Sequence, residues 1–157
     1  MGDHTETLQI DYDPSIISYN EILQVFWDNH NPAARSWSRQ YMAIVFFHDE
    51  DQEQAAKHSK KIVEQALGTQ VYTEIQPYTN FYLAEDYHQK YYLQNMPRLA
   101  REIKAYYPDI SDLTNSTLAA RLNGIAGGYG DASLLEQELD SYGLTPQGQD
   151  IIKEIVY

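Results

Sequence analysis

Polar and hydrophobic residues alternate near the start of the chain, and this alternation predicts a half-buried strand over residues 5–12. The pattern then changes to the period of an amphipathic helix, which we expect near residues 18–29. Ser18 is a natural N-cap for this helix because Glu21, three residues later, completes a capping box. Pro32 lies beyond the helix and prevents its continuation.

The middle of the chain contains an almost unbroken apolar run, which predicts a strand near residues 41–47 that is buried on both faces. Acidic residues follow, and they favour a helix over residues 50–67 because carboxylates stabilise a helix N-terminus. Another strand is predicted near residues 71–75. After an irregular segment we expect a long helix over residues 85–106, interrupted near Pro97.

Short amphipathic helices are predicted in the last third of the chain. The first begins at Thr117 and ends at Gly127, and the second covers residues 134–142 with Ser133 as its N-cap. The third begins at Thr145, which is followed by a proline at the first helical position. Helices this short are marginal in isolation, so we expect them to pack on the rest of the chain.

The predicted order of elements is strand, helix, strand, helix, strand and then several helices, which indicates an α+β fold. We expect residues 1–110 to form one domain and residues 111–157 to form a helical C-terminal extension packed on it. Three strands are few for a complete two-layer domain, so the sheet is expected to lack part of its strands.

The composition excludes several classes of function. Eleven basic residues stand against 23 acidic ones, a formal net charge of −12 that repels nucleic acid and anionic lipid. The chain contains no cysteine, so it has no disulfide framework, no thiolate zinc site and no thiol redox chemistry of its own. No signal peptide and no apolar run of bilayer length are present, and we expect a cytoplasmic protein without contact to membranes.

Three motifs carry most of the functional information. They lie at residues 3–6, which lead into the first predicted strand, at residues 39–45 and at residues 81–91. In this order and at this spacing they resemble the A-class peptide methionine sulfoxide reductases. The resemblance extends over residues 2–107. It implies a two-layer ferredoxin-like sandwich that here lacks its first β-α-β portion.

The resemblance also implies roles for the first two motifs. In the family, a glutamate two residues after a histidine holds and protonates the sulfoxide oxygen, and Glu6 follows His4 in this way. A carboxyl in an aromatic, poorly hydrated pocket has a raised pKa and can donate a proton near neutral pH. Tyr41 matches the tyrosine that offers its hydroxyl to the same oxygen. Taken alone, Glu6 is typical of a polar surface and Tyr41 of a core strand.

The third motif implies that Asp86 and His88 help to bind the substrate, with His88 as a polar brace beneath the site. No arrangement of His, Asp and Glu typical of a metal site is found, and no cofactor is implied. One departure from the family pattern concerns Ser36, which stands where an aspartate is usual. Methionine and alanine also follow Tyr41 where arginine and serine are typical.

The family's Gly-Cys-Phe-Trp motif, which carries the nucleophile and an aromatic wall for the substrate methyl group, has no counterpart here. Trp27 is predicted on a helix face and Trp37 in a polar loop, so neither is interpreted as an equivalent of that wall. The reaction requires a thiolate that takes the oxygen as a sulfenic acid, which thioredoxin finally reduces. We therefore expect this chain to be inactive as it stands.

Three hypotheses follow. In the first, the chain is part of a methionine sulfoxide reductase that repairs oxidised methionine, and the nucleophile lies upstream of Met1, either as a cysteine or as a selenocysteine whose UGA codon is read as a stop. In the second, the chain is a nucleophile-free module that binds methionine sulfoxide peptides or another protein. In the third, it is an acidic structural domain with vestigial motifs. Thioredoxin is expected as a partner only where a nucleophile is restored.

The predicted strand near residues 41–47 also has a consequence for stability. In the family an additional strand lies beside it, and an unpaired apolar edge is a template for aggregation. We expect the 157-residue chain on its own to be unstable, to dimerise through this edge or to aggregate.

Overall fold

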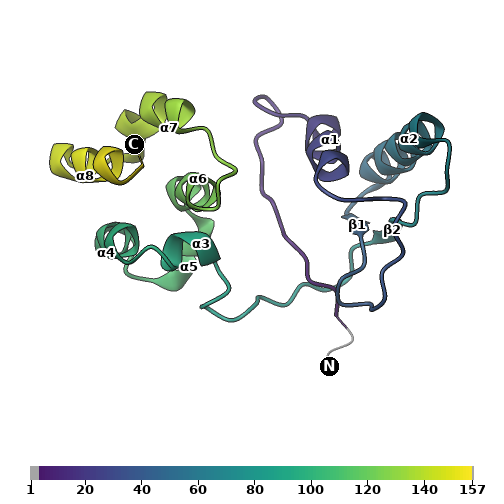
Figure 1. Cartoon of the computed structure of the whole chain (residues 1–157), viewed down its shortest axis with the longest axis horizontal. Coiled ribbons are helices and arrows are strands. Elements are labelled where there is room, and N and C mark those ends of the chain that lie inside the picture. Colours follow the sequence, from purple (N-terminus) through teal and green to yellow (C-terminus); the bar gives the residue numbers. More distant parts are fainter. Residues whose placement is uncertain (1–3, 157) are drawn as a thin grey trace. The chain divides into compact units, whose positions relative to one another are not determined.

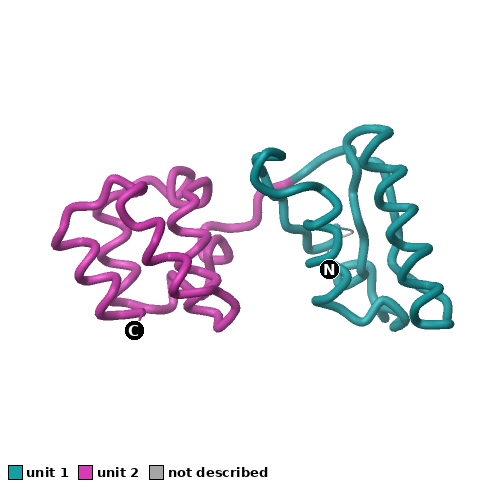
Figure 2. The backbone as a smooth tube through the Cα atoms, turned by 90° about the horizontal axis from the view of Figure 1, so that it is seen from above, with its two compact units in different colours: residues 1–81 teal, residues 82–157 magenta. Residues whose placement is uncertain are grey.

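The computed structural model describes residues 4–156, and within them the chain combines eight α-helices with one two-stranded parallel sheet (Figure 1). This helix-rich arrangement has the α+β character expected from the order of elements. The chain divides into two compact units, Met1–Phe81 (unit 1) and Tyr82–Tyr157 (unit 2), which Figure 2 shows in different colours. No helix among the described residues is both long enough and apolar enough to cross a membrane.

Unit 1 is built around the sheet. Strand β1 (Ile44–Phe47) pairs in parallel with β2 (Glu74–Pro77), with Ile44 opposite Glu74. Parallel strands need a crossover connection, which helix α2 (Glu50–Leu67) provides. Helix α1 (Tyr19–Asp28) packs against α2, and the small core between these elements contains five buried residues: Leu23, Trp27, Val45, Ala56 and Val71.

Local signals explain where the two helices of unit 1 begin and end. The Ser18 hydroxyl accepts a hydrogen bond from Glu21 N, and the Glu21 carboxylate accepts one from Ser18 N, so the predicted capping box is present. Asp49 caps α2 in a similar way, and Gly68 ends it with a φ of 63°, a left-handed conformation that glycine adopts without strain. The predicted helices at 18–29 and 50–67 are therefore confirmed.

Unit 2 is a small helical bundle (Figure 1). Its core contains eleven buried residues, most of them leucine, and none comes from unit 1. The elements are α3 (Tyr91–Gln94), α4 (Pro97–Tyr106), α5 (Ile110–Asn115), α6 (Thr117–Ala126), α7 (Ala132–Glu138), the 3-10 helix η1 (Leu139–Tyr142) and α8 (Pro146–Val156).

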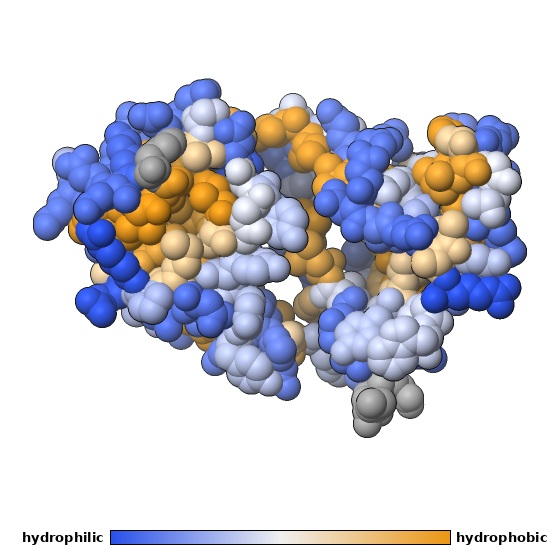
Figure 3. Space-filling model, viewed as in Figure 1, coloured by the Kyte–Doolittle hydropathy of each residue, from blue (hydrophilic) through white to orange (hydrophobic). Residues whose placement is uncertain are grey.

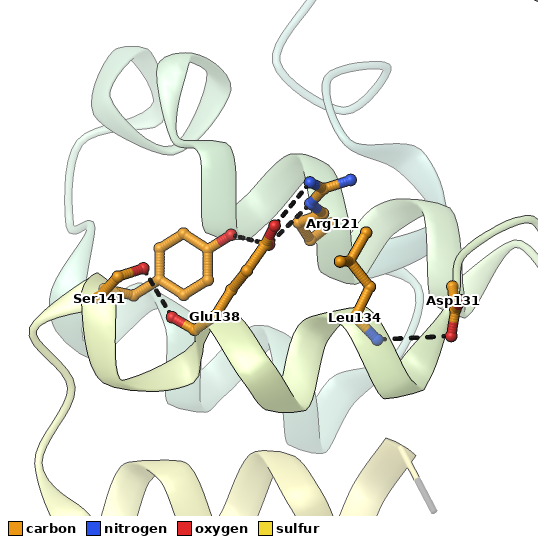
Figure 4. Close-up of polar contacts among 6 residues, drawn as sticks. Arg121, Asp131, Leu134, Glu138 and Ser141 are labelled. Atoms are coloured by element: carbon orange, nitrogen blue, oxygen red, sulfur yellow. Dashed lines mark hydrogen bonds and ion pairs between the residues drawn. The ribbon is translucent and has the colours of Figure 1, made fainter. Parts of the chain in front are cut away.

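Charged contacts on the surface of unit 2 join helices that are distant in sequence. The Arg121 guanidinium on α6 donates two hydrogen bonds, of 3.0 and 2.8 Å, to the carboxylate of Glu138 on α7 (Figure 4). The Tyr142 hydroxyl donates a third, of 2.6 Å, to the same carboxylate. Arg98 on α4 forms a comparable pair with Glu154 on α8. These pairs join α6 to α7 and α4 to α8 at the surface of unit 2.

The prediction for the start of the chain was wrong. Residues 5–12 form no strand among the described residues: the segment is irregular and Leu8 is 79% exposed. Alternation alone cannot form a strand when no neighbouring strand provides hydrogen-bond partners. The other two strands exist but are displaced, because β1 begins at Ile44 rather than near 41 and β2 covers 74–77 rather than 71–75. The Tyr72 backbone N–H donates instead to the carbonyl of Pro32.

Unit 2 also corrects the predictions. The predicted helix over 85–106 does not begin at 85, because residues 86–90 form turns. The interruption near Pro97 is confirmed, since Pro97 is the first residue of α4. Helix α5 was not predicted. The N-cap of α7 is Asp131 rather than Ser133, because the Asp131 carboxylate accepts hydrogen bonds from Ser133 N and from Leu134 N, the second of which is drawn in Figure 4.

Candidate functional site

Residues 5 and 6 are hydrogen-bonded to the turn that contains Tyr41. The Glu6 backbone N–H donates to the carbonyl of Gln40 at 3.0 Å, and the Gln40 side-chain amide donates to the Glu6 carboxylate at 2.8 Å. The Thr5 hydroxyl donates to the carbonyl of Arg39 at 3.0 Å. Glu6 and Gln40 thus hold each other through backbone and side chain, and the Glu6 carboxylate is fixed beside the residue that precedes Tyr41.

Tyr41 lies in a turn, not in the strand that follows it, and its side chain is 53% exposed. The turn is closed by a hydrogen bond from Met42 N to the carbonyl of Arg39. The ring of Trp37, which is 80% exposed, lies 5.4 Å from the Tyr41 ring at an interplanar angle of 46°. Aromatic pairs at this distance attract each other and offer a continuous apolar surface to a ligand.

A tight loop presents Trp37. The Ser36 hydroxyl donates to the carbonyl of Ser38 at 2.6 Å and accepts from Ser38 N, which locks the three residues into a turn. Ser36 stands where the family that the chain resembles usually has an aspartate, and here it orients Trp37. The Ser38 hydroxyl oxygen is buried without a hydrogen-bond partner among the described residues.

Trp37 was missed as a functional candidate because its loop is polar. The only signal in the sequence is its position four residues before Tyr41, which becomes significant once the turn brings the rings together. Glu6 and His4 are exposed, so the described residues do not form the enclosed, poorly hydrated pocket that was expected around Glu6. What unit 1 offers is an open surface with a carboxylate, a phenol and an indole ring. Hydrophobic surface is visible among hydrophilic residues in Figure 3.

The third motif lies in unit 2, in the turns before α3. The carbonyl of Asp86 accepts hydrogen bonds from Gln89 N and from the Gln94 side chain, which hold the turn in place. The His88 imidazole lies 3.8 Å from the Glu85 carboxylate, and both side chains are mostly exposed. Asp86 lines a pocket of about 220 Å³, whose other lining residues are Gln94, Lys104, Tyr107, Pro108, Ile110 and Leu113.

Lys90 is an unpredicted feature of this motif. Its backbone adopts a left-handed conformation with a φ of 48°, the only positive φ of a non-glycine residue among those described. Such conformations are strained and often occur near functional sites. The side chain is partly buried, and this burial lowers the pKa of the Lys90 ammonium group.

The predicted site residues therefore fall into two groups. His4, Glu6 and Tyr41 lie in unit 1, whereas Asp86 and His88 lie in unit 2. That the two groups converge on one substrate stays a prediction. Among the described residues, no three His, Cys, Asp or Glu side chains are grouped closely enough to hold a metal ion.

Family models match both parts of the chain. The model described as "Peptide methionine sulfoxide reductase" matches residues 1–116. The model described as "Selenoprotein methionine sulfoxide reductase A, helical domain" matches residues 109–157.

Curated relatives give a consistent result. A "Peptide methionine sulfoxide reductase" of Drosophila melanogaster is 43% identical over 149 residues, which cover 93% of this chain and 59% of the relative. A "Peptide methionine sulfoxide reductase MsrA" of Methanosarcina acetivorans is 38% identical over 107 residues, 60% of this chain and 57% of the relative. That of Sulfolobus acidocaldarius is 39% identical over 94 residues, 57% of this chain and 53% of the relative. The chain thus spans between half and three-fifths of the length of these relatives.

Proposed function

The chain belongs to the peptide methionine sulfoxide reductase family, and we propose from this that it provides the substrate-binding and proton-donating part of a peptide methionine (S)-sulfoxide reductase. Its substrate is oxidised methionine in proteins. The observation that supports this role most directly is the anchoring of Glu6 beside Tyr41 through Gln40.

The proposed chemistry follows from the groups at this site. Once an additional segment encloses the site, the Glu6 carboxyl donates a proton to the sulfoxide oxygen, and the Tyr41 hydroxyl donates a hydrogen bond to the same oxygen. Withdrawal of electron density from the S–O bond makes the sulfur electrophilic. A thiolate then attacks this sulfur, and the protonated oxygen passes to the thiolate sulfur as the original S–O bond breaks, so that the sulfoxide is reduced to the thioether and the thiolate is oxidised to a sulfenic acid. The Trp37 ring contacts the apolar part of the substrate.

The nucleophile must come from outside this chain, which contains no cysteine. We propose that the chain has no reductase activity as it stands, and that a cysteine or selenocysteine on an additional segment completes the site. The match of residues 109–157 to a helical domain named for a selenoprotein favours selenocysteine. Thioredoxin enters as reductant only once such a nucleophile is present.

We propose further that β1 is an inner strand of a ferredoxin-like sandwich whose first β-α-β portion is supplied by the same additional segment. In the parallel pair, Glu74 N and Tyr78 N donate to the carbonyls of Ala43 and Phe47, so the backbone groups of residues 75 and 77 point to the outer edge of β2. Pro77 has no N–H to offer, which is typical of a natural edge strand. The outer edge of β1 has no proline, and we place the neighbouring strand there. The domain boundary is proposed near residue 110, in keeping with the separate family match from residue 109.

One observation tests the origin of the nucleophile. Translation of the DNA upstream of the Met1 codon is expected to show an open frame with Gly-Cys-Phe-Trp, or with an in-frame UGA in place of the cysteine codon. Unrelated upstream sequence would exclude this proposal and favour the alternative, a binding module for methionine sulfoxide peptides. The exposed aromatic pair of Trp37 and Tyr41 is compatible with that alternative.

A second experiment tests the site itself. The chain is joined to a family segment that carries the thiol, and reduction of a methionine sulfoxide peptide is measured. We expect Glu6→Gln to lower kcat/KM by about 10²–10⁴-fold, as for loss of a general acid. Tyr41→Phe removes only a hydrogen bond and is expected to have a smaller effect. Full activity of both variants would remove these residues from the mechanism, whereas activity of the unmodified 157-residue chain would contradict the need for a thiol.

A further inference from the structure

Positive charge in unit 1 is concentrated on one stretch of helix α2. Unit 1 has 5 basic and 12 acidic residues, a formal net charge of 5 − 12 = −7, and three of the five basic residues are Lys57, Lys60 and Lys61. They occupy adjacent turns of the helix and, at i and i+3 or i+4, share one face. A surface that repels anions almost everywhere therefore has one short segment that attracts them.

The three lysines line a hollow of about 540 Å³ between α2 and β2, together with Gln54, His58, Glu64 and Ile75. Glu64 is the only acidic residue in this lining, and its carboxylate accepts a hydrogen bond from Val71 N. The lining thus carries a formal charge of 3 − 1 = +2 with the histidine neutral. We call this hollow the α2 basic pocket.

The contacts of the lysines show which charges are available to a ligand. The Lys60 ammonium donates to the carbonyl of Thr73 at 2.8 Å, which holds it at the border of β2. The Lys57 ammonium pairs with Glu53, outside the pocket, at 2.6 Å, and its side chain is half-exposed. Lys61 is exposed and has no hydrogen bond or ion pair with any described residue. None of these groups belongs to the Glu6 site.

The spacing of the lysines indicates which kind of anion fits the pocket. Lys57 and Lys61 are one turn apart, about 6 Å along the helix axis. Alternate side chains of an extended chain are about 6.7 Å apart and point to the same side. Two carboxylates at alternate positions of an extended segment therefore match the spacing of Lys57 and Lys61 along the helix, and the carboxylate at Lys57 shares its ammonium group with Glu53. A nucleic acid would need many more phosphate contacts than this one pocket offers, and the remaining charge of unit 1 would repel its backbone.

We propose that the α2 basic pocket is a docking site for an acidic, extended segment of a partner protein, with Asp or Glu at alternate positions. Such a segment would lie along the outer edge of β2, near Ile75, with its carboxylates toward α2. The attraction is electrostatic, so it raises the rate of encounter and depends strongly on salt. The inference does not depend on reductase activity, because it involves no residue of the Glu6 site.

The test uses the full chain and a fluorescein-labelled Glu-Ser-Glu-Ser-Glu peptide, with binding followed by fluorescence anisotropy at about 10 mM and about 150 mM salt. In the double variant Lys57→Gln/Lys61→Gln we expect Kd to increase about tenfold at low salt. The matched control Arg101→Gln/Lys153→Gln removes the same charge from unit 2 and is expected to leave Kd within about twofold. Far-UV circular dichroism verifies the fold of each variant.

Three results would overturn the proposal. Equal weakening in the lysine variant and in the control would show that only the net charge matters. Absence of binding by the unmodified chain up to about 1 mM peptide would show that no docking site exists. Displacement of the peptide by an equal concentration of inorganic phosphate would assign the pocket to small phosphate anions instead of a protein segment.

Discussion

Two side chains near Tyr41, Glu6 and Trp37, are held in place by hydrogen bonds of their neighbours without being part of the core. Gln40 fixes Glu6, and the Ser36 turn fixes Trp37, yet the Trp37 ring itself contributes little to the core because it is 80% exposed. Trp27 is the opposite case. Its ring is 6% exposed and its indole N–H donates to the Ser59 hydroxyl at 3.0 Å.

The two tryptophans therefore predict opposite effects of substitution. Trp37→Ala is expected to weaken binding of a methionine sulfoxide peptide by about threefold to tenfold, because one aromatic contact is lost, and to leave the melting temperature unchanged. Trp27→Ala should instead lower the unfolding free energy by about 3–5 kcal/mol, since it creates a cavity. Isothermal titration with the peptide measures binding by the wild type and by each variant, and a denaturant titration measures stability. A fall in stability for Trp37→Ala would show that this ring is structural.

Lys90 gives a second prediction at this scale. A left-handed backbone conformation costs about 1–2 kcal/mol in a residue with a side chain, and the partly buried ammonium group adds a desolvation penalty. We expect Lys90→Gly to raise the unfolding free energy of unit 2 by about 1 kcal/mol in urea titrations. Lys104→Gly, in the last turn of α4, serves as the control and should be slightly destabilising. Unchanged stability in Lys90→Gly would mean that the left-handed conformation is not strained.

At the scale of secondary structure, the contact between α6 and α7 depends on a charged carboxylate. The Tyr142 hydroxyl and the Arg121 guanidinium hold the pKa of Glu138 below its ordinary value of 4.5. Because the folded pKa is the lower one, the stabilisation is fully present above pH 4.5 and is lost as the pH falls through the pKa of the folded state. Acid should therefore loosen the attachment of α7.

Glu138→Gln tests this dependence. At about pH 7 the variant is expected to be less stable than the wild type by roughly 1 kcal/mol or less, because the pair is partly exposed to solvent. The difference should shrink as the pH falls below 4.5, since protonated Glu138 no longer differs in charge from glutamine. Urea unfolding of both proteins at several pH values between about 7 and 3 measures this difference. A constant difference over the whole range would rule out the charged contact as its cause.

The helices with strong local signals could be predicted from sequence almost to the residue. Ser18 and Glu21 cap the start of α1, Asp49 caps the start of α2, and Gly68 ends α2. Each of these signals involves residues only a few positions apart, so it can be recognised in the sequence. Residues 5–12 could not be predicted because a strand depends on a distant partner, and within this described segment the hydrogen bonds to the turn at 39–40 come from Thr5 and Glu6. Residues 86–90 were misassigned because an acidic pair also suits a turn, and the Gln94 side chain stabilises that turn.

The candidate site shows the same limit. Glu6 and Tyr41 could be identified from motifs, and their proximity follows from hydrogen bonds made by Gln40, the residue before the tyrosine. The ring contact of Trp37 with Tyr41 could not be predicted, because it depends on the turn between them. Lys90 was missed for a similar reason, since no local rule places a lysine in the left-handed region.

For the whole molecule, the two units differ in the size of their cores. The core of unit 1 contains five buried residues and that of unit 2 contains eleven, and no residue is shared. A two-stranded sheet is marginal by itself, and apolar residues of unit 1 such as Leu8, Ile10 and Val25 are exposed. Unit 1 is therefore the less stable part of the chain and the part that carries an open strand edge.

Hydrogen exchange of the full chain tests this difference. We expect the amides of β1 and β2 to exchange faster than those of α4 and α6, and unit 1 to self-associate as concentration rises while unit 2 keeps its protection. Light scattering detects the association. Uniform protection with a single cooperative melt of a monomer would show that the units unfold together and that the edge of β1 is harmless.

The order of the units along the chain determines how long the open edge of β1 is exposed during synthesis. When translation starts at Met1, without an upstream segment, unit 1 leaves the ribosome first, and the residues of Tyr82–Tyr157 follow at about 5–20 per second, which takes about 4 to 15 s. Strand pairing needs only microseconds, so for all of this interval β1 can meet the same edge on a nascent chain from a neighbouring ribosome. The density of ribosomes on the message, rather than the final protein concentration, then sets the risk of misassociation.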